Sequence, residues 1–409
     1  MRFTYLHILL LFAFLLAETA ILSAGPPQGK RKFQFAGEYG LWVEAYDQQL
    51  KVAWFTEKAD HGFLEAWQDG RAIHTVTTSL AQAHRDSFAV SGESDVLLRY
   101  GSVKNLEDRH EMVIAAAAVR GYQPFVFENV DSIYAIGDVH GQYDDLLQLL
   151  QNNRLLDGQG RWKGGRRHLV FMGDLFDRGH NVIKTLWFLY RLEQEAAQQG
   201  GRVLFLLGNH EIMNFLYDDR YVSGKEKLVA QYHRVRYSDM FNPRRSVLGQ
   251  WLASKSGLLK IDDVLFAHGG ISLPYTAFTL QSYNDSLHAF LQEPEFTSLT
   301  DTSVTSVRGS AILYARRIQF FWNANSVFWY RGYMQSDTLG AQLQKVLDAF
   351  NAQLKVVGHT PVKSITQYYG GRLIAVDLNN PATEMLLLVR DKQKYWRYRC
   401  FLRGNPELM

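Results

Sequence analysis

The chain has 409 residues, of which 47% are hydrophobic and 21% are charged. This composition is typical of a globular protein with two or three domains, and it excludes a collagen-like, low-complexity or disordered chain. Lys and Arg total 44 against 41 Asp and Glu. The resulting net charge of +3 indicates neither a nucleic-acid partner nor a broadly basic membrane-binding face. The single cysteine, Cys400, excludes an internal disulfide and a cysteine-rich zinc module.

Residues 1–24 have the pattern of a secretory signal peptide, with a positive start, an apolar run over residues 6–16 and small residues at the end. An uncleaved anchor is the alternative, because extending the run to Leu22 nearly reaches the roughly 20 residues that span a bilayer. Glu18 counts against spanning, whereas Leu22 is a poor match to the cleavage pattern before Ala24. We expect cleavage, and in either case an exported protein, periplasmic or secreted. It would contact a membrane only through a retained anchor.

A linker over residues 25–32 is followed by short runs of alternating apolar and polar residues, separated by turn residues, over residues 33–118. Leu50–Phe55 and Val96–Tyr100 are two such runs, and their period of two at this spacing predicts an antiparallel all-β sandwich. We expect this N-terminal accessory domain to have a structural or recognition role, because it contains no cluster of catalytic residue types. Its isolated histidines are expected to be surface or strand residues; they include His61, His74 and His84.

Strands alternate with helices in the remainder, which predicts an α/β domain with layered sheets and helices over residues 126–409. The first expected strands are Ile133–Ile136, His168–Met172 and Val203–Leu207, with helices over Tyr143–Gln151 and Asn181–Gln199. Further strands are expected at Leu258–Lys260, Val264–Ala267, Leu354–Val357, Leu373–Val376 and Met385–Val389.

Five short polar blocks in this domain follow apolar strands, at the place where open α/β sheets bind ligands. They are Gly137-Asp138-Val139-His140-Gly141, Gly173-Asp174-Leu175-Phe176-Asp177-Arg178-Gly179, Gly208-Asn209-His210-Glu211, His268-Gly269-Gly270 and Gly358-His359-Thr360-Pro361. Each block alone is a weak signal. Because all five occur in order at strand ends, we interpret them as one site.

Asp, His and Asn side chains without cysteine are ligands suited to Mn, Fe or Zn. One carboxylate can bridge two ions roughly 3.5–4 Å apart, and Asp174 in the second block is the expected bridge. Asp138 and His140 would complete the first site; Asn209, His268 and His359 would complete the second. We therefore expect two divalent or trivalent ions per chain, with a shared water acidified towards hydroxide as the nucleophile.

The remaining polar residues of the blocks suit hydrolysis of a phosphate ester. Arg178 offers a planar fork of donors for a phosphoryl group. His210 is placed to protonate the leaving oxygen, and Asp177 could orient its imidazole and raise its pKa. Glu211 is expected to support the ligands rather than bind metal. Histidines outside the blocks, namely His168, His180 and His233, are expected to be structural, and the aromatic stretch 320–333 to be core or pocket wall.

Together the blocks resemble the phosphoprotein phosphatases, within the calcineurin-like metallophosphoesterases, from about Ser132 to Asp377. Met213-Asn214 with Asp219–Val222, and Val327–Tyr333, resemble the Shewanella-like phosphatase branch. The resemblance implies a β-sandwich flanked by helices, a dinuclear metal centre and dephosphorylation without a phosphoenzyme. It also implies that Arg331 is the second phosphate-binding arginine. The long segment between His268 and Arg331 departs from the wider family and is expected to shape the entrance to the site.

Because members of this branch tend to favour phosphotyrosine, we expect a phosphorylated protein or peptide as substrate. The residues expected to bind it are Arg178, Arg331, Asn209 and His210. A dinucleoside polyphosphate hydrolase or phosphodiesterase on the same metal centre is the alternative. Glu211, in place of an Asp after Asn209-His210, and the complete Asp177-Arg178-Gly179 sequence weigh against it. A non-catalytic binding protein with a relict site is a more remote alternative, which the complete ligand set disfavours.

Overall fold

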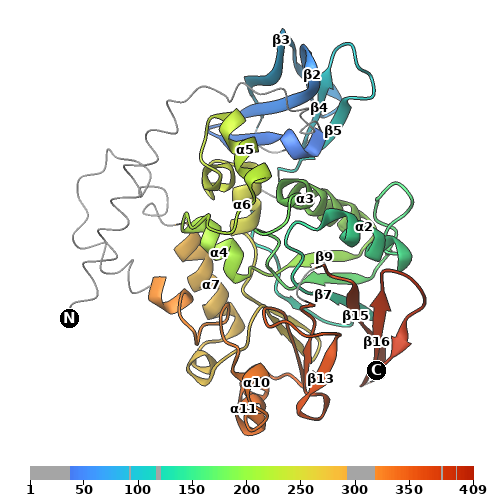
Figure 1. Ribbon diagram of the computed structural model, residues 1–409, viewed down its shortest axis with the longest axis vertical. Helices are drawn as coiled ribbons and strands as arrows, with labels where there is room; N and C mark the ends of the chain where they lie inside the picture. Colours follow the sequence, from blue (N-terminus) through green and yellow to red (C-terminus); the bar gives the residue numbers. More distant parts are fainter. Residues whose placement is uncertain (1–36, 92–93, 117–120, 293–317, 379–380, 393) are drawn as a thin grey trace, which may run out of the picture.

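The computed structural model describes residues 37–91, 94–116, 121–292, 318–378, 381–392 and 394–409 (Figure 1). The expected signal peptide or anchor at 1–24 and the linker at 25–32 lie outside the described residues, as does the middle of the long segment between His268 and Arg331. In the part of the chain that is described, we find no helix with both the length and the apolar character required to cross a membrane.

The N-terminal part, here called the sheet module (described residues 37–116), contains one short 3-10 helix and one antiparallel sheet. Its elements are η1 (Gly37–Gly40), β1 (Trp42–Tyr46), β2 (Gln49–Gln68), β3 (Arg71–Ala89), β4 (Val96–Ser102) and β5 (Arg109–Ile114). Neighbouring strands run in the order β1-β2-β4-β5, and β3 pairs with β2. The all-β character agrees with the expectation.

The expected sandwich is wrong, because the described strands of the sheet module form a single sheet rather than two facing sheets. Leu50–Phe55 and the later run Phe63–Trp67 belong to one long strand, β2, which continues through register shifts between Phe55 and Asp60. Such irregularities bend a strand without ending it, so the polar residues between the two runs are not a turn.

The face that a second sheet would cover is packed on the α/β body (residues 126–409). One hydrophobic core includes Val43 and Leu98 of the sheet module together with Trp187 of α3 (Val182–Gln198). The indole Nε1 of Trp187 donates to the carbonyl of Leu41 at 2.9 Å. In Figure 1, α3, α5 (Gly224–His233) and α6 (Val247–Ala253) lie between the sheet module and the rest of the body.

In its described residues, the α/β body contains two six-stranded sheets. The first has the order β13-β14-β12-β11-β10-β6, and the second β17-β16-β15-β7-β8-β9. Their strands are β6 (Val126–Phe127), β7 (Ser132–Ile136), β8 (His168–Phe171), β9 (Arg202–Phe205), β10 (Leu258–Ile261), β11 (Val264–Ala267), β12 (Leu354–Val357), β13 (Thr366–Tyr368), β14 (Leu373–Ala375), β15 (Glu384–Asp391), β16 (Lys394–Phe401) and β17 (Glu407–Leu408).

The inner faces of the two sheets share a second core that includes Ile133, Val170, Phe266 and Ile374. Helices cover the outer faces: α2 (Tyr143–Asn152), α3, α4 (Asn209–Phe215), α5, α6, α7 (Leu280–Leu291), α10 (Gly332–Gln335) and α11 (Gly340–Ala349), with the 3-10 turns η3 (Ser238–Phe241), η4 (Leu273–Ala277) and η5 (Tyr369–Gly371). This is the β-sandwich flanked by helices, of mixed α/β class, that the sequence predicts.

Candidate metal centre and active site

The five polar blocks meet because parallel strands bring their carboxyl ends to one edge. β7, β8 and β9 are adjacent and parallel, as are β11 and β12 in the facing sheet. Five of the six predicted ligands lie in the loops after these strands, and Asn209 is the first residue of α4, which follows β9. All six are buried: Asp138, His140, Asp174, Asn209, His268 and His359. Glycine is required in this arrangement, since a Cβ at Gly208 would stand 2.2 Å from Oδ1 of Asp174.

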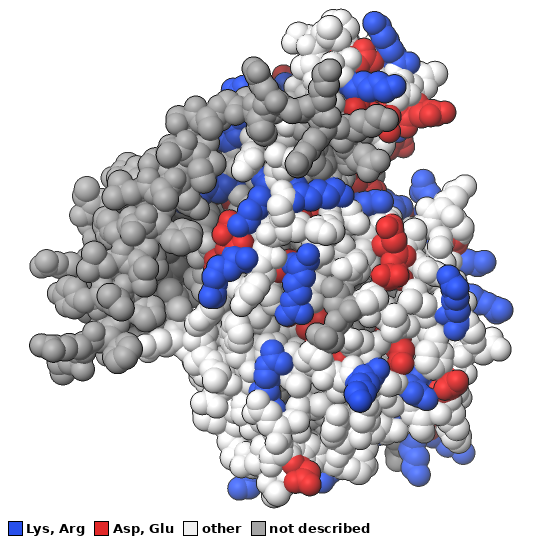
Figure 2. All heavy atoms as spheres, in the orientation of Figure 1, with Lys and Arg blue, Asp and Glu red and all other residues white. Residues whose placement is uncertain are grey.

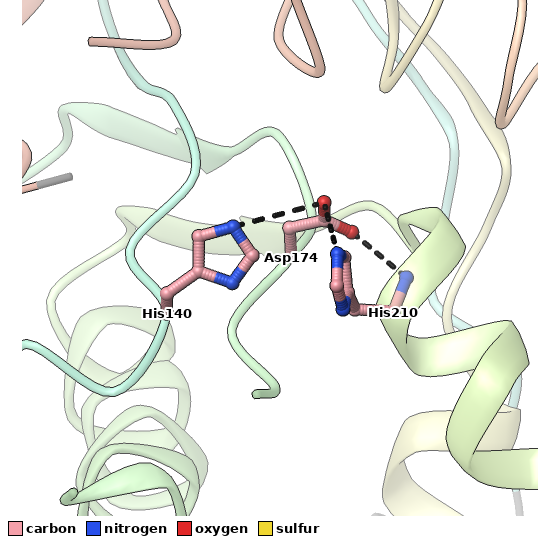
Figure 3. A group of neighbouring side chains, drawn as sticks. All are labelled: His140, Asp174 and His210. Carbon is pink, nitrogen blue, oxygen red and sulfur yellow. Dashed lines mark hydrogen bonds and ion pairs between the residues drawn. The ribbon is translucent and has the colours of Figure 1, made fainter. Parts of the chain in front are cut away.

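His140 presents one ring nitrogen to the site. Its Nδ1 donates to the carbonyl oxygen of Phe176 at 2.7 Å, which fixes the ring and leaves Nε2 facing Asp174 (Figure 3). That Nε2 is buried, has no hydrogen-bond partner among the described residues, and lies 4.0 Å from Oδ2 of Asp174. Burial lowers the pKa of His140 to about 4, so the imidazole is neutral at pH 7, as a metal ligand must be.

Asp174 stands between two groups of ligand atoms. Its Oδ2 lies 4.0 Å from Nε2 of His140 and 3.8 Å from Nε2 of His210 (Figure 3). Its Oδ1 accepts the backbone N–H of His210 at 3.0 Å and lies 3.3 Å from Nε2 of His268. The carboxylate therefore belongs to two clusters whose ligand atoms lie within 4.8 Å of one another and could hold a metal ion: His140, Asp174 and His210; and Asp174, His268 and His359.

The second cluster also includes Asn209. Nδ1 of His268 donates to the carbonyl of Met172 at 2.7 Å, and its Nε2 lies 3.0 Å from Oδ1 of Asn209. Nε2 of His359 is buried without a hydrogen-bond partner in the described part of the chain. Burial also lowers the pKa of His359 to about 2, so this ring is neutral.

Asp138 lies beside the second cluster, where its Oδ1 accepts the backbone N–H of His359 at 3.1 Å. Burial raises the pKa of Asp138, and the nearby carboxylate of Asp377 raises it further. Asp377 was missed as a site residue, although it follows an apolar strand, β14, as the predicted ligands do. The structure thus brings all six predicted ligands into one buried region, and their role as ligands stays a prediction.

His210 and Asp177 form a closely paired acid and base. Nδ1 of His210 lies 2.5 Å from Oδ2 of Asp177, and its Nε2 lies 3.5 Å from Nη2 of Arg178. Burial by itself lowers the pKa of His210, but Asp174 and Asp177 outweigh it and the pKa is raised. Burial raises the pKa of the Asp177 carboxyl. The structure thus places Asp177 against Nδ1 of His210, and its orienting role in catalysis stays a prediction.

Arg331 lies on the side of the second cluster, close to His359. Its Nη1 donates to the carbonyl of His359 at 2.6 Å, and its Nη2 lies 3.5 Å from Nδ1 of the same residue. Beside the arginine is a cavity of 610 Å³ whose walls include Trp322, Trp329 and Tyr330. The aromatic stretch is thus both core and pocket wall, since Phe328 is fully buried.

Glu211 holds the second and third blocks together. Its carboxylate accepts the backbone N–H groups of Asp174 (2.8 Å), Gly208 (2.6 Å), Leu175 (2.8 Å) and Phe176 (3.3 Å). This network is the supporting role that the sequence predicts. The histidines outside the blocks do not join the site: His168 and His233 hydrogen-bond to backbone carbonyls, and His180 is exposed.

Comparison with known proteins agrees with this geometry. The sequence pattern of the calcineurin-like phosphoesterases matches residues 132–363. The chain is 27% identical, over 65% of its length and 70% of the relative, to Shewanella-like protein phosphatase 1 of Plasmodium berghei. It is 26% identical, over 41% of its length and 55% of the relative, to the symmetrical bis(5'-nucleosyl)-tetraphosphatase of Vibrio cholerae.

Among solved structures, a cold-active protein-tyrosine phosphatase from a psychrophilic Shewanella species superimposes with a TM-score of 0.70 and 28% identity. The superposition covers 90% of this chain and 98% of that protein. These findings support the resemblance to the Shewanella-like phosphatases and indicate a hydrolytic metallophosphatase. Since the family pattern spans more than half of the sequence, the chain belongs to the calcineurin-like phosphoesterase family.

Proposed function

We propose that this chain is a protein phosphatase that hydrolyses phosphotyrosine in proteins or peptides, using two metal ions held around Asp174. The observation that carries the proposal is that one buried carboxylate belongs to two clusters of ligand atoms. The unpartnered Nε2 atoms of His140 and His359 support it, because a buried polar atom without a partner is costly unless something binds it.

The donor set fits two ions such as Mn, Fe or Zn, because it contains imidazole, carboxylate and amide groups and no thiolate. Asp138, His140 and Asp174 would hold one ion; Asp174, Asn209, His268 and His359 would hold the other. When bound, the ions would supply an acidified water as nucleophile, so that no phosphoenzyme is required, and would neutralise charge on the phosphoryl oxygens.

The other residues bind the phosphoryl group and move a proton. Arg178 stands beside His210, and Arg331 stands beside His359, so the two guanidinium groups approach the clusters from different loops. Both would bind phosphoryl oxygens, with Asn209 and His210 close to the same group. His210, protonated because its pKa is raised, would donate a proton from Nε2 to the leaving oxygen while Asp177 holds Nδ1.

The aromatic walls of the cavity beside Arg331 support a preference for an aromatic substrate side chain. The test is a matched panel of phosphotyrosine and phosphoserine peptides, assayed with Mn after removal of other metals by chelation. We expect faster turnover of the phosphotyrosine peptides. The Asp174→Asn variant is the control for contaminating phosphatases. Inactivity on both peptides, with fold and metal content intact, would overturn the protein-phosphatase proposal.

A dinucleoside polyphosphate hydrolase is the second candidate, since the chain is similar to a symmetrical bis(5'-nucleosyl)-tetraphosphatase. Faster hydrolysis of a bis(5'-nucleosyl) tetraphosphate than of any phosphopeptide in the panel would reverse the order of the two candidates. A relict, purely binding site is disfavoured by the complete set of buried ligands. Failure to retain metal together with failure to hydrolyse either substrate class would support it.

We also propose that the protein is exported, on the basis of the apolar run at residues 6–16. N-terminal sequencing of the protein recovered from its native host tests this proposal. A start after residue 24 is expected, and an intact start in a soluble cytoplasmic fraction would contradict it.

A further inference from the structure

A second cavity, of 670 Å³, lies where the sheet module meets the α/β body. It is lined by η1 and β5 of the module and by residues of α3 and α5 of the body, and none of the residues placed in the metal centre lines it. Figure 2 shows Lys and Arg side chains gathered along this junction. The cavity is therefore a separate feature with a positively charged lining.

Some of the charged groups in the lining already have partners. Arg191 lies 3.7 Å from the carboxylate of Glu38, and Glu111 is paired with Arg99 at 2.7 Å. Arg109 donates to backbone carbonyls, at 3.3 Å and 2.9 Å. The acidic groups of the lining are thus engaged by arginines, and the charge of Lys184 acts on the carboxylate of Glu38 without forming an ion pair with it.

Within the described ranges, Arg109 has no carboxylate oxygen within 4.0 Å but already donates to backbone carbonyls. The other lining cations without a carboxylate oxygen within 4.0 Å are Lys184 and Lys225. Both side chains are half-buried and held in place. Nζ of Lys184 lies 3.9 Å from the ring centre of Tyr143, and Nζ of Lys225 lies 4.1 Å from that of Tyr39. Nζ of Lys225 also donates to Oδ1 of Asn181 at 3.0 Å.

The two ammonium groups are close enough to act on each other. Burial lowers the pKa of Lys225, the carboxylate of Glu226 raises it, the charge of Lys184 lowers it, and the carboxylate of Asp144 raises it. Glu226 offsets the pair only in part, because burial raises its pKa to about 7 and this buried carboxyl is therefore not fully ionised at neutral pH. A partly desolvated pair of like charges beside a cavity favours an anion between them.

We propose that this cavity is an anion-binding site, in which Lys184 and Lys225 hold a phosphate or carboxylate group. The site adjoins the active-site loop, because Asn181, which contacts Lys225, is separated from Asp177-Arg178-Gly179 only by His180. An acidic group of a bound substrate and a free oxyanion are two sources of the same chemistry. The proposal does not depend on which phosphate ester the metal centre hydrolyses.

The direct test is a selenate soak of crystals of the full chain, with anomalous scattering used to locate the anion. We expect a peak within hydrogen-bonding distance of both Nζ atoms in the wild type and its loss in the Lys184→Gln/Lys225→Gln variant. Lys227→Gln is the matched control, since Lys227 is also on α5 but is paired with Asp219 at 3.1 Å. Absence of the peak from the wild type, or its persistence in the double variant, would overturn the proposal. If the double variant fails to fold, Lys225→Gln alone replaces it.

Kinetics then distinguish the two sources. A pair of phosphopeptides that differ only in acidic or neutral flanking residues is compared with p-nitrophenyl phosphate. If a substrate group occupies the site, the double variant raises KM for the acidic peptide by roughly threefold to tenfold and leaves its kcat unchanged. The kcat and KM for p-nitrophenyl phosphate also stay unchanged. If selenate binds but all substrates respond equally, the site takes a free oxyanion. These kinetics test only the source, so failure of the proposed phosphotyrosine preference leaves the anion site intact.

Discussion

Asp177 and His210 are joined by a hydrogen bond of 2.5 Å between Oδ2 and Nδ1, which places the opposite ring nitrogen 3.8 Å from the carboxylate of Asp174. The bond fixes the ring with its proton on Nδ1. Nε2 is thereby directed to the region that both predicted metal clusters share. Five residues of sequence, Asp174–Arg178, thus contain three residues with predicted roles: the bridging carboxylate (Asp174), the orienting carboxylate (Asp177) and a phosphate-binding arginine (Arg178).

Replacing His210 with Asn tests whether this residue is a proton donor rather than a metal ligand. We expect turnover to fall by roughly 10²- to 10⁴-fold, the usual contribution of a positioned general acid. Metal content measured by mass spectrometry should stay at the wild-type value, since the other ligands remain. A variant that loses one metal ion per chain would show instead that His210 is a ligand, as its membership of the first cluster allows.

The Asp177→Asn variant should shift the pH dependence of kcat. The carboxylate raises the pKa of His210 by favouring the charged imidazolium, so its removal lowers that pKa. Because the donor must be protonated, activity is lost as pH rises through the pKa, and the alkaline limb of the profile should move to lower pH. A limb at the wild-type position, with a lower maximum only, would contradict the proposed donor.

Arg331→Ala should lower kcat/KM by about 100-fold, since loss of one preorganised donor to the transition state costs on the order of 3 kcal/mol. Arg331→Lys keeps the charge but not the forked donors and should recover only part of the loss. Circular dichroism and metal content are the controls for fold and site. Full activity of the alanine variant would remove Arg331 from the phosphate-binding residues.

Glu226 is predicted to make stability depend on pH. Burial raises its pKa to about 7, its Oε1 accepts two hydrogen bonds, and its Oε2 has no partner in the described structure. For an acid whose folded pKa exceeds its unfolded value of about 4.5, the protonated form is favoured by folding. The free energy of unfolding therefore falls as pH rises from about 4.5 to 7.

The Glu226→Gln variant should remove this contribution, because an amide keeps one acceptor oxygen and carries no charge. Relative to the wild type, it should gain roughly 3 kcal/mol in free energy of unfolding between pH 4.5 and 7, measured by urea denaturation. Glu226→Ala, which leaves the Tyr39 hydroxyl and a backbone N–H unpaired, should be less stable at every pH. A constant difference between wild type and the Gln variant would refute the raised pKa.

The architecture of the α/β body was predictable because its apolar runs predict strands and the polar blocks that follow them occur in order along the chain. Apolar runs such as Ile133–Ile136 and Val264–Ala267 are followed at once by Gly, Asp or His. The end of an apolar run therefore locates a polar block, and the polar block confirms where the strand ends. Parallel pairing then brings distant blocks to one edge, a consequence of topology that spacing alone does not specify.

The sheet module was less predictable, because a polar segment inside a long strand resembles a turn. Residues 56–60 contain charged side chains that are normally found in loops, yet the strand continues through them. The partner of its apolar face is a set of helices more than 100 residues away, which no local pattern indicates. Asp377 was missed for a related reason, since it stands out only through the effect of its charge on the pKa of Asp138 and not through a motif.

The central claim is that Asp174 bridges two metal ions, and it is tested most directly by the metal content of the purified full chain. After chelation and reconstitution with Mn, we predict two ions per chain for the wild type and loss of metal in Asp174→Asn. Lys227→Gln, which lies outside the site, should bind as the wild type does. One ion or none in the folded wild-type chain, or two ions in folded Asp174→Asn, would contradict the account.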